Sequence, residues 1–532
     1  MENDFSRLID LPMLTYPHAL LHDALRKRAC EESDRVAIVF ENRSLTFADL
    51  DVESNRLAHG LRALGLKSGD RLGIYMPNCP EVEIAFYAAS KLGAVGCPLN
   101  SAYREREVTY QLNSAGARML ITHAKLWPVI EAALPGLAAP LTIILVGDEA
   151  PDSYSNIIDY YDVVDGQSAG PPIAHIDPDQ VAALPFSSGT TGMPKGVMLT
   201  HRNLAINHEQ WGSRLQLSPD DCYIIYQPLS HIYGVTMMGV SVRSGSKQIL
   251  LERFDLETVV RLIEEHGVTW LFAVPPTLLT LANTPWLDRS HFRTVKYAFS
   301  AAAPLPPDVA RRVEDRFGFR IVQGYGLTEA GPATHQTPLD RIKPESSGPL
   351  LPDTELRVVD IETGEIDLPP GETGEIVVRG PQIMKGYWNA PEETARALRD
   401  GWLYTGDIGR VDEDGYIYIV DRKKEMIKYK SFSIAPAELE AVLLEHPDIE
   451  DCGVTGAPDA DAGEIPKAFV VPRAGRTIDL DALARFVSER VAGYKQIRHF
   501  EIIDAIPKSP SGKILRRILK QQAASDDTVR GA

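Results

Sequence analysis

The segment SSGTTGMPKG, residues Ser187–Gly196, restricts the fold and function of this sequence more than any other stretch. It follows the apolar run VAALPF, which predicts a buried strand. Two glycines and four hydroxyl residues in six positions cannot fill a core, but their N–H groups and hydroxyls can approach phosphate oxygens. Lys195 adds a positive charge. The segment therefore predicts a phosphate-binding loop.

The spacing of this loop differs from the ordinary P-loop, GxxxxGK[ST], because Lys195 is followed by Gly196. A flexible Ser/Thr/Gly turn is the alternative for a loop of this composition. The order of the ten residues resembles the phosphate loop of the adenylate-forming superfamily. That superfamily contains acyl-CoA synthetases, luciferase and the adenylation domains of peptide synthetases.

Four more segments follow in the order of that superfamily, and the resemblance extends from about Leu45 to Arg517. The segments are QGYGLTE (Gln323–Glu329), YTGD (Tyr404–Asp407), DRKKEMIKYKSFSIAPAELE (Asp421–Glu440) and PKSPSGKILRR (Pro507–Arg517). Taken singly, an exposed Glu, a TGD turn or a lysine in a Pro/Ser/Gly loop is ordinary surface. Together they favour an enzyme over a nucleotide-binding module without activity, and no GxGxxG after a strand supports a dehydrogenase.

The resemblance implies a role for each matching residue. Nucleotide contacts are implied for Ser187, Ser188, Gly189, Thr190, Thr191, Gly192, Lys195, Ala302, Ala303, Pro304, Gln323, Gly324, Tyr325, Gly326, Thr328, Asp407 and Arg422. Catalytic roles are implied for Lys513, Lys428, His231 and Thr328, and Mg²⁺ ligation for Thr190 and Glu329. A hinge is implied at Asp421, and coenzyme A contacts at Lys430, Ser431 and Phe432.

The acid would lie against His231, Tyr233, Gly234, Ala301, Gly326, Gly331 and Pro332. Amino-acid-activating relatives carry an Asp where this chain has Ile232, and no acidic residue occurs from Cys222 to Leu251. An ammonium group would remain unpaired there, which disfavours α-amino acids. Acetate-specific relatives carry Trp at Gly326, so we expect an acid larger than acetate. The segments KYKSF and GEIVVRG look most like the 4-coumarate–CoA ligase branch, which suggests an aryl, arylpropenoic or medium-chain acid.

The expected function is therefore an AMP-forming ligase that uses ATP, Mg²⁺ and coenzyme A. Many relatives carry glycine where this chain has Ser431, and glycine lets a pantetheine arm pass close to the backbone. A stand-alone adenylating enzyme that passes its acyl group to a carrier protein is the alternative. A luciferase-like oxygenase is a further, weaker one.

Composition agrees with a cytoplasmic enzyme acting on small molecules. The chain has 532 residues and a net charge of −18, which disfavours tracking along nucleic acid. Five scattered cysteines predict neither a disulfide framework nor a zinc site. The N-terminal stretch lacks the features of a signal peptide, and no apolar window is long enough to span a membrane. We expect a monomer or homodimer.

The hydrophobic pattern predicts an α/β plus α+β fold in two domains, 1–420 and 421–532. Thr46 and Asp49 form a capping box ahead of a helix that ends near Gly65. Strands and helices alternate to about residue 330, which predicts parallel-rich α/β layers. The strands from Arg357 onward predict antiparallel structure, a distorted β-barrel in the resembling family. A small mobile α+β domain follows, with Pro436 at a first helical position and a loose polar end.

Overall fold

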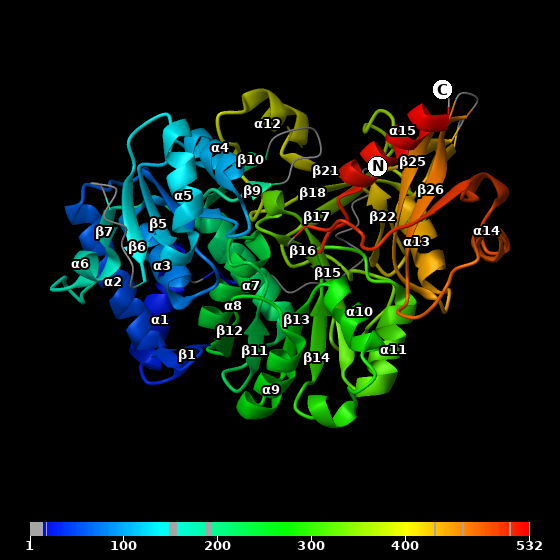
Figure 1. Cartoon of the computed structure of the whole chain (residues 1–532). Helices are drawn as coiled ribbons and strands as arrows, with labels where there is room; N and C mark the ends of the chain where they lie inside the picture. The colour runs from blue at the N-terminus through cyan, green and yellow to red at the C-terminus, as the bar shows by residue number, and fades with distance from the viewer. Residues whose placement is uncertain are drawn as a thin grey trace.

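The computed structural model describes residues 14–16, 19–147, 157–187, 194–429, 432–459, 462–509 and 512–530. Four sheets organise these residues, three in a large N-terminal part and one in a smaller C-terminal part (Figure 1). We call residues 1–426 the large domain and residues 427–532 the small domain. The predicted mixed α/β fold with a large and a small domain is confirmed.

The first sheet has eight strands in the order β16-β15-β14-β13-β11-β12-β1-β2, and its central strands are parallel. Fully buried apolar runs such as Trp270–Ala273 explain this, because both faces of the sheet are covered. The strands are β1 (Val36–Phe40), β2 (Arg43–Thr46), β11 (Cys222–Ile225), β12 (Lys247–Leu250), β13 (Trp270–Ala273), β14 (Tyr297–Ser300), β15 (Arg320–Gly326) and β16 (Ala333–Gln336).

The second sheet contains nine strands and joins parallel and antiparallel pairs. Its strands are β3 (Arg71–Tyr75), β4 (Val95–Leu99), β5 (Met119–His123), β6 (Thr142–Val146), β7 (Ile157–Asp159), β8 (Val181–Ala183), β9 (Phe186–Ser187), β10 (Lys195–Thr200) and β19 (Gly386–Tyr387). The run VAALPF is thus two short strands, and β9 and β10 pair through Ser187 and Lys195 on either side of the glycine-rich segment. That pairing fixes both ends of the predicted phosphate loop.

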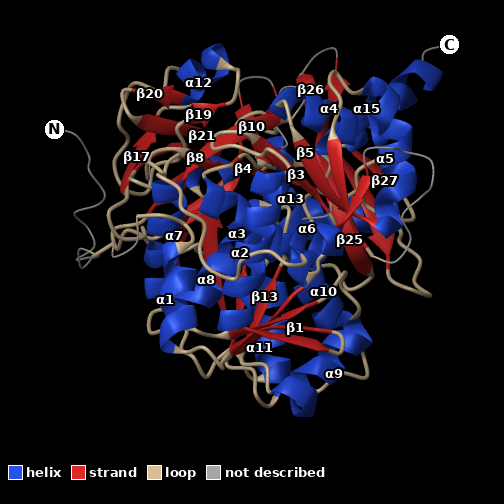
Figure 2. Cartoon of the chain, turned by 90° about the vertical axis from the view of Figure 1, so that its left-hand side faces the viewer, coloured by secondary structure: helices blue, strands red, loops and turns tan. Residues whose placement is uncertain are grey.

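Helices pack between these two sheets and on their outer faces (Figure 2). The helix predicted after Leu45 is α2 (Phe47–Ala63), and it has the expected Thr46–Asp49 capping box. The other helices of the large domain are α1 (Asp23–Glu31), α3 (Pro80–Leu92), α4 (Glu105–Ala115), α5 (Trp127–Ala133), α6 (Tyr160–Val164), α7 (His201–Leu215), α8 (Ile232–Ser244), α9 (Leu256–His266), α10 (Pro275–Asn283), α11 (Pro307–Phe317) and α12 (Pro391–Ala397).

The third sheet is antiparallel throughout and corresponds to the β-rich part predicted after Arg357. Its strands are β17 (Glu355–Val359), β18 (Gly374–Arg379), β20 (Leu398–Arg399), β21 (Trp402–Val411) and β22 (Ile417–Arg422). The ten-residue strand β21 pairs with β18, β20 and β22, and it changes register at Ile408. The chain leaves this sheet for the small domain just after Arg422.

The small domain contains one sheet with helices packed on it. Its strands are β23 (Ile427–Tyr429), β24 (Phe432–Ile434), β25 (Ile449–Asp459), β26 (Gly463–Pro472) and β27 (His499–Ile502), and its helices are α13 (Pro436–Leu444), α14 (Leu480–Ser488) and α15 (Arg516–Arg530). Pro436 occupies the predicted first turn of α13. The expectation of a loose polar end is wrong, because α15 buries Leu519 and Ala523 in the core of this domain.

Candidate active site

Asp407 and Arg422 face each other across two strands of the third sheet, where they are paired in register. The Arg422 Nε lies 3.0 Å from Asp407 Oδ1, and the Tyr325 hydroxyl donates to Asp407 Oδ2 at 2.7 Å. Asp407 is buried, so two partners compensate its desolvation. The YTGD, DRKK and QGYG segments, far apart in the sequence, therefore meet at one carboxylate.

Glu329 lies beside this group in the short 3₁₀ turn Thr328–Ala330. Its Oε1 accepts a hydrogen bond of 2.8 Å from the Tyr387 hydroxyl. The Lys195 ammonium lies 5.2 Å from the centroid of the same Tyr387 ring. Tyr387 thus connects the glycine-rich segment to the QGYGLTE segment. Nothing in the sequence around Tyr387 pointed to it, because only the pairing of β10 with β19 brings it here.

His231 precedes α8 and caps its first turn, because its Nδ1 accepts from the Tyr233 N–H at 3.2 Å. Burial lowers the pKa of His231 to about 4, and the charge of Lys513 acts in the same direction. The imidazole is therefore neutral at pH 7, with Nδ1 as the acceptor and the proton on Nε2. That leaves one N–H donor, which can hold a carboxylate oxygen.

Lys513 reaches this group from the small domain. Its backbone is fixed by a tight loop, in which the Lys513 N–H donates to Ser509 Oγ at 3.1 Å and its carbonyl accepts from the Ser509 N–H at 2.8 Å. Burial and the charge of Arg422 lower the pKa of the Lys513 ammonium, whereas Asp407 and Glu329 oppose that shift. The charges of Arg422, Asp407 and Glu329 in the large domain therefore act on the Lys513 ammonium, and the role that the PKSPSGK segment implies for Lys513 stays a prediction.

The wall predicted for the acid consists of backbone and small side chains. A Cβ placed on Gly326 would lie 2.0 Å from the Pro332 carbonyl oxygen, so this position has no room for a side chain. Gly331 O faces α8, where Thr236 Oγ1 lies 3.5 Å away. Ala301 packs beside Tyr325 against the main core.

Ala302 has the left-handed φ of +73°, a conformation that alanine adopts at a cost. The segment SAAAPL, residues Ser300–Leu305, therefore carries backbone strain at Ala302.

Aromatic side chains pack behind this wall. Tyr233 is buried and contacts the rings of Trp211 and Phe299 at centroid distances of 6.0 and 6.2 Å. Phe272 extends the cluster towards the first sheet. All four rings are buried in the main core of the large domain, and Gly324 of the QGYG segment packs directly on Phe299.

Asp421 lies at the connection between the domains. Its backbone pairs with Ile408 in the third sheet, whereas its Oδ2 accepts from the Ala437 N–H of α13 at 2.9 Å. Burial raises the pKa of this carboxyl. Arg516, three residues after Lys513, pairs with Glu440 through two contacts of 3.0 Å. The predicted hinge residue is thus bonded to both domains.

Some predicted residues are not brought into the site. Lys428 is exposed on β23, where its backbone N–H donates to Glu464 Oε2 at 2.9 Å. The Gln323 amide donates to the Pro344 carbonyl at 2.5 Å and is buried. The residues Ser188, Gly189, Thr190, Thr191, Gly192, Lys430 and Ser431 lie outside the described part of the chain, as does the side chain of Phe432.

The remaining predicted residues lie around the site. Thr328 O accepts from the Gly331 N–H at 3.3 Å, and Gly324 packs so closely on Phe299 that a Cβ would lie 2.6 Å from that ring. Gly234 is equally confined, because a Cβ there would lie 2.5 Å from the Pro228 carbonyl oxygen. Ala303 and Pro304 follow Ala302 in the turn after β14.

The donors present fit a magnesium ion carried by a nucleotide. Within the described residues, no cluster of three or more His, Cys, Asp or Glu side chains is arranged to hold a metal. Mg²⁺ needs only one or two protein oxygens when phosphates and waters supply the others. Glu329 offers such an oxygen beside the cations, whereas Asp407 already serves Tyr325 and Arg422.

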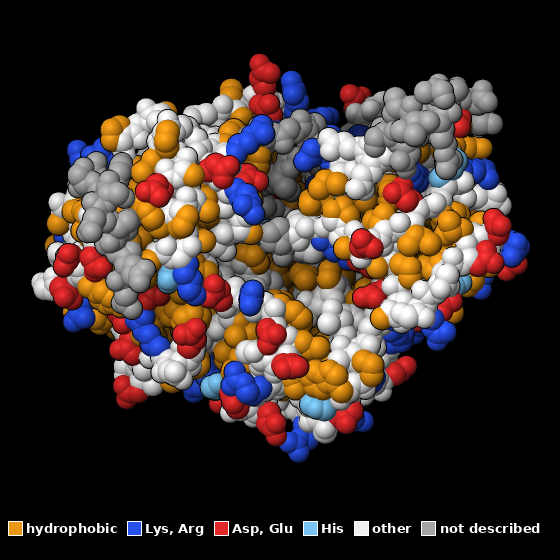
Figure 3. All heavy atoms as spheres, viewed as in Figure 1, with side chains coloured by type: hydrophobic (Ala, Val, Ile, Leu, Met, Phe, Trp, Pro, Cys, Tyr) orange, Lys and Arg blue, Asp and Glu red, His pale blue; other side chains and the backbone are white. Residues whose placement is uncertain are grey.

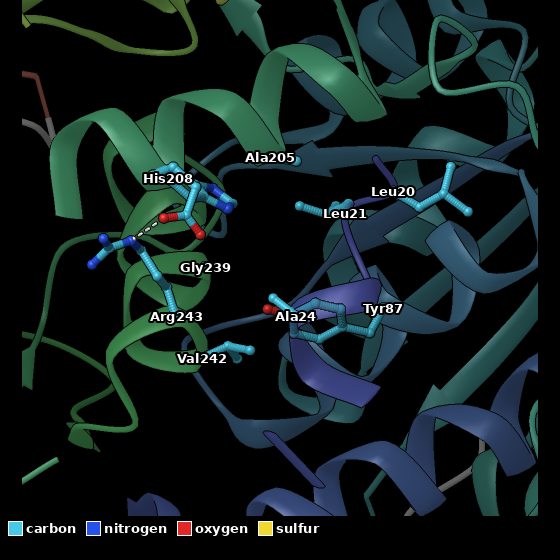
Figure 4. Close-up of a pocket in the computed structure, with 10 residues that line it drawn as sticks. Leu20, Leu21, Ala24, Tyr87, Ala205, His208, Gly239, Val242 and Arg243 are labelled. Carbon is cyan, nitrogen blue, oxygen red and sulfur yellow. Dashed lines mark hydrogen bonds and ion pairs between the residues drawn. The ribbon is translucent and has the colours of Figure 1, made fainter. Parts of the chain in front are cut away.

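A second cavity lies away from this site, between α1, α7 and α8 (Figure 4). His208 packs there against Gly239, and Arg243 pairs with Glu209 at 2.6 Å. The cavity holds about 10 Å³, which is room for one water molecule and not for a substrate.

In the part of the chain that the structure describes, no helix has the length and apolar character needed to cross a membrane.

The sequence matches two family models. The family described as AMP-binding enzyme matches residues 25–388, and the AMP-binding enzyme C-terminal domain matches residues 438–513. A protein from Solanum tuberosum named 4-coumarate–CoA ligase 1 is 39% identical over 531 residues, covering 97% of this chain and 96% of its own. The predicted resemblance is therefore confirmed.

Solved structures agree with this match. An anthranilate CoA ligase, AuaEII, in complex with anthranoyl-AMP has a TM-score of 0.89 and 26% identity, covering 97% of this chain and 98% of its own. ATP-bound MatB from Rhodopseudomonas palustris has a TM-score of 0.86 and 30% identity, covering 95% of this chain and 98% of its own.

Proposed function

Because the chain belongs to the family of AMP-binding enzymes, we propose that it joins a carboxylic acid to coenzyme A through an acyl-adenylate. The observation that carries this proposal is the group of charges around Asp407, in which Arg422 pairs with Asp407 and the charges of Arg422, Asp407 and Glu329 act on Lys513. One cation from the small domain thus joins the charged groups of the large domain. This arrangement suits a reaction between two anions.

In the first half-reaction a carboxylate oxygen of the acid bonds to the α-phosphorus of ATP, and the bond to pyrophosphate breaks. The neutral His231 donates its Nε2–H to the acid and orients it. Asp407 accepts from the ribose hydroxyls, and Lys195 balances phosphate charge. A magnesium ion held by Glu329, together with Thr190, would neutralise further phosphate charge. Lys513 stabilises the negative charge that develops on the bridging oxygen.

In the second half-reaction the coenzyme A thiol gives its proton to solvent and the sulfur attacks the acyl carbon. The carbonyl–oxygen bond to AMP breaks, which leaves a thioester and AMP. We propose that the small domain turns about Asp421, so that Lys513 leaves and the segment with Lys428, Lys430, Ser431 and Phe432 approaches. The position of Asp421 supports this proposal, because Asp421 is bonded both to the third sheet and to α13, and Lys428 is exposed on β23 of the small domain.

The acid we propose is an aryl or arylpropenoic acid. Support comes from the relatives named 4-coumarate–CoA ligase. The absence of any acidic residue from Cys222 to Leu251 disfavours an amino acid. Medium-chain acids share the apolar requirement, and one methylene discriminates by only about 1–3 kcal/mol.

The experiment is a measurement of AMP and pyrophosphate with ATP, Mg²⁺ and a panel of acids, with and without coenzyme A. AMP release that depends on coenzyme A and is largest for arylpropenoic acids supports the proposal. ATP–pyrophosphate exchange without thioester formation would replace it by transfer to a carrier protein. No exchange with any acid would refute it.

A further inference from the structure

The small domain rests on α10 and α11, which lie directly below it in Figure 1. The loop that carries Lys513 approaches the start of α10, since a Cβ on Gly512 would lie 3.1 Å from Pro276. At the other end of α10, the Arg473 Nη1 donates to Asn283 Oδ1 at 2.8 Å. Both contacts join the two domains.

Asn283 Oδ1 is shared by two cations. Besides Arg473 of the small domain, the Arg312 Nη2 of α11 donates to the same oxygen at 2.5 Å. Burial and the charge of Arg312 lower the pKa of Arg473, so the two guanidinium groups oppose each other. Because the Asn283 amide is neutral, Arg473 can leave it without the separation of an ion pair.

The interface beside Asn283 is loosely packed. A cleft of about 380 Å³ separates the domains, and it is lined by Pro276, Leu279 and Trp286 of the large domain and by Lys508 of the small one. A hollow between the two parts of the molecule is visible in Figure 3. Close packing would have filled such a space. Because few packing contacts fix the orientation of the small domain here, the hydrogen bond at Asn283 contributes a larger share than it would in a closely packed interface.

We propose that Asn283 is a positioning residue, which holds the small domain in the adenylate-forming orientation through Arg473. Arg473 and the loop that carries Lys513 both belong to the small domain. By holding Arg473, Asn283 therefore keeps Lys513 in its position at the active site. This inference rests on the proposed function, in which the second half-reaction requires the domain to turn. Release of Arg473 from Asn283 then precedes thioester formation.

Two substitutions at one position test the proposal in opposite directions. Asn283→Ala removes the shared acceptor, and we expect ATP–pyrophosphate exchange to fall about tenfold, while thioester formation from preformed acyl-adenylate is retained. Asn283→Asp places a negative charge between two cations. We expect it to retain exchange and to slow the thioester step about tenfold.

The matched control is in the same loop as Arg473. Arg473→Ala should reproduce Asn283→Ala, and the double variant should be no worse than either single one. Arg476→Ala should leave both half-reactions unchanged, since the ion pair of Arg476 is with Asp448 of its own domain. Arg312 also donates to the Ala282 carbonyl, and Arg473 to the Pro447 carbonyl, so both side chains keep a partner in the Asn283 variants, which should fold.

A distance measurement gives a readout that a merely structural role would not move. Cys30 is exposed in the large domain, and Glu489→Cys would place a second spin label in the small domain. We expect Asn283→Ala to shift the distance distribution and Asn283→Asp to narrow it. The inference would be overturned if both substitutions changed the two half-reactions equally. It would also be overturned if neither substitution changed either half-reaction. Wild-type enzyme lacking either half-reaction would instead refute the proposed function.

Discussion

The two halves of the active site are held in different ways. Asp407 of the large domain is fixed by strand pairing and by two side-chain partners, Tyr325 and Arg422. Lys513 of the small domain is fixed mainly by bonds within its own loop, next to a loosely packed interface. The comparison agrees with the proposed function, in which the rigid half binds and orients and the group that stabilises developing charge is withdrawn.

The largest expected effect tests the movable half. Lys513→Ala should lower ATP–pyrophosphate exchange by about 10²–10³, because one preorganised charge is lost from the transition state. Transfer from preformed acyl-adenylate to coenzyme A should be retained. Lys508→Ala is the control, since Lys508 lies in the same segment but pairs with Asp451 at 2.6 Å. Normal ATP–pyrophosphate exchange by the Lys513 variant would show that Lys513 does not stabilise the charge that develops during adenylate formation.

A smaller effect is expected in the rigid half. Asp407→Asn should raise the KM for ATP by about 10- to 100-fold, because a charged acceptor for the ribose is lost. Tyr325→Phe removes only one of the partners that orient Asp407, so its KM should rise less. Steady-state kinetics with ATP varied at saturating acid measures both. If Asp407→Asn lowered kcat alone, Asp407 would not be a binding group.

The interior of the large domain predicts a pH effect on stability. Glu83 is fully buried, and burial raises its pKa to about 8, although Gln248 donates to its Oε2 at 2.9 Å. The folded state therefore holds a proton that the unfolded chain releases near pH 4.5. The contribution of Glu83 to the free energy of unfolding is complete below about pH 4.5. It decreases as the pH rises from there, and it is lost once the pH has passed 8.

Glu83→Gln should remove that loss, so the free energy of unfolding of the variant relative to the wild type should be about 3 kcal/mol higher at pH 9 than at pH 6. Urea unfolding at the two pH values measures it. Glu105→Gln on the exposed side of α4 should leave the pH dependence as in the wild type. Unchanged pH dependence in the Glu83 variant would show that its carboxyl is not the responsible group.

The smallest effect concerns strain beside the site. Ala302→Gly should stabilise the protein by about 1 kcal/mol, because glycine adopts the left-handed φ of +73° without steric cost. Ala303→Gly should instead destabilise it slightly, since glycine gains entropy on unfolding. Urea unfolding compares the two. Destabilisation by Ala302→Gly would mean that the methyl group contributes more by packing than it costs in strain.

Much of the fold could be predicted because its signals are local. The Thr46–Asp49 capping box, the position of Pro436 and the alternation of strands and helices all depend on neighbouring residues. The end of the chain was misjudged for the same reason. Helix α15 has a polar composition, and only its packing against the small domain shows that Leu519 is buried.

The site was predicted in part. The sequence placed Asp407, Arg422, Glu329 and Lys513 together through the order of their segments, and the structure brings them together. Tyr387 escaped prediction because its role depends on the pairing of β10 with β19. Asn283 and Arg473 escaped because neither lies in a recognisable segment.

The sequence by itself determined the kind of chemistry, because a phosphate loop and a mobile-loop lysine carry their chemical requirements in residue type and spacing. The tertiary structure alone decided that the charge of Asp407 acts on Lys513, that Arg473 contacts Asn283 across the two domains, and where backbone strain lies. These features depend on atoms that are brought together from distant segments. Their energies arise from packing, burial and charge proximity, and no local pattern records those.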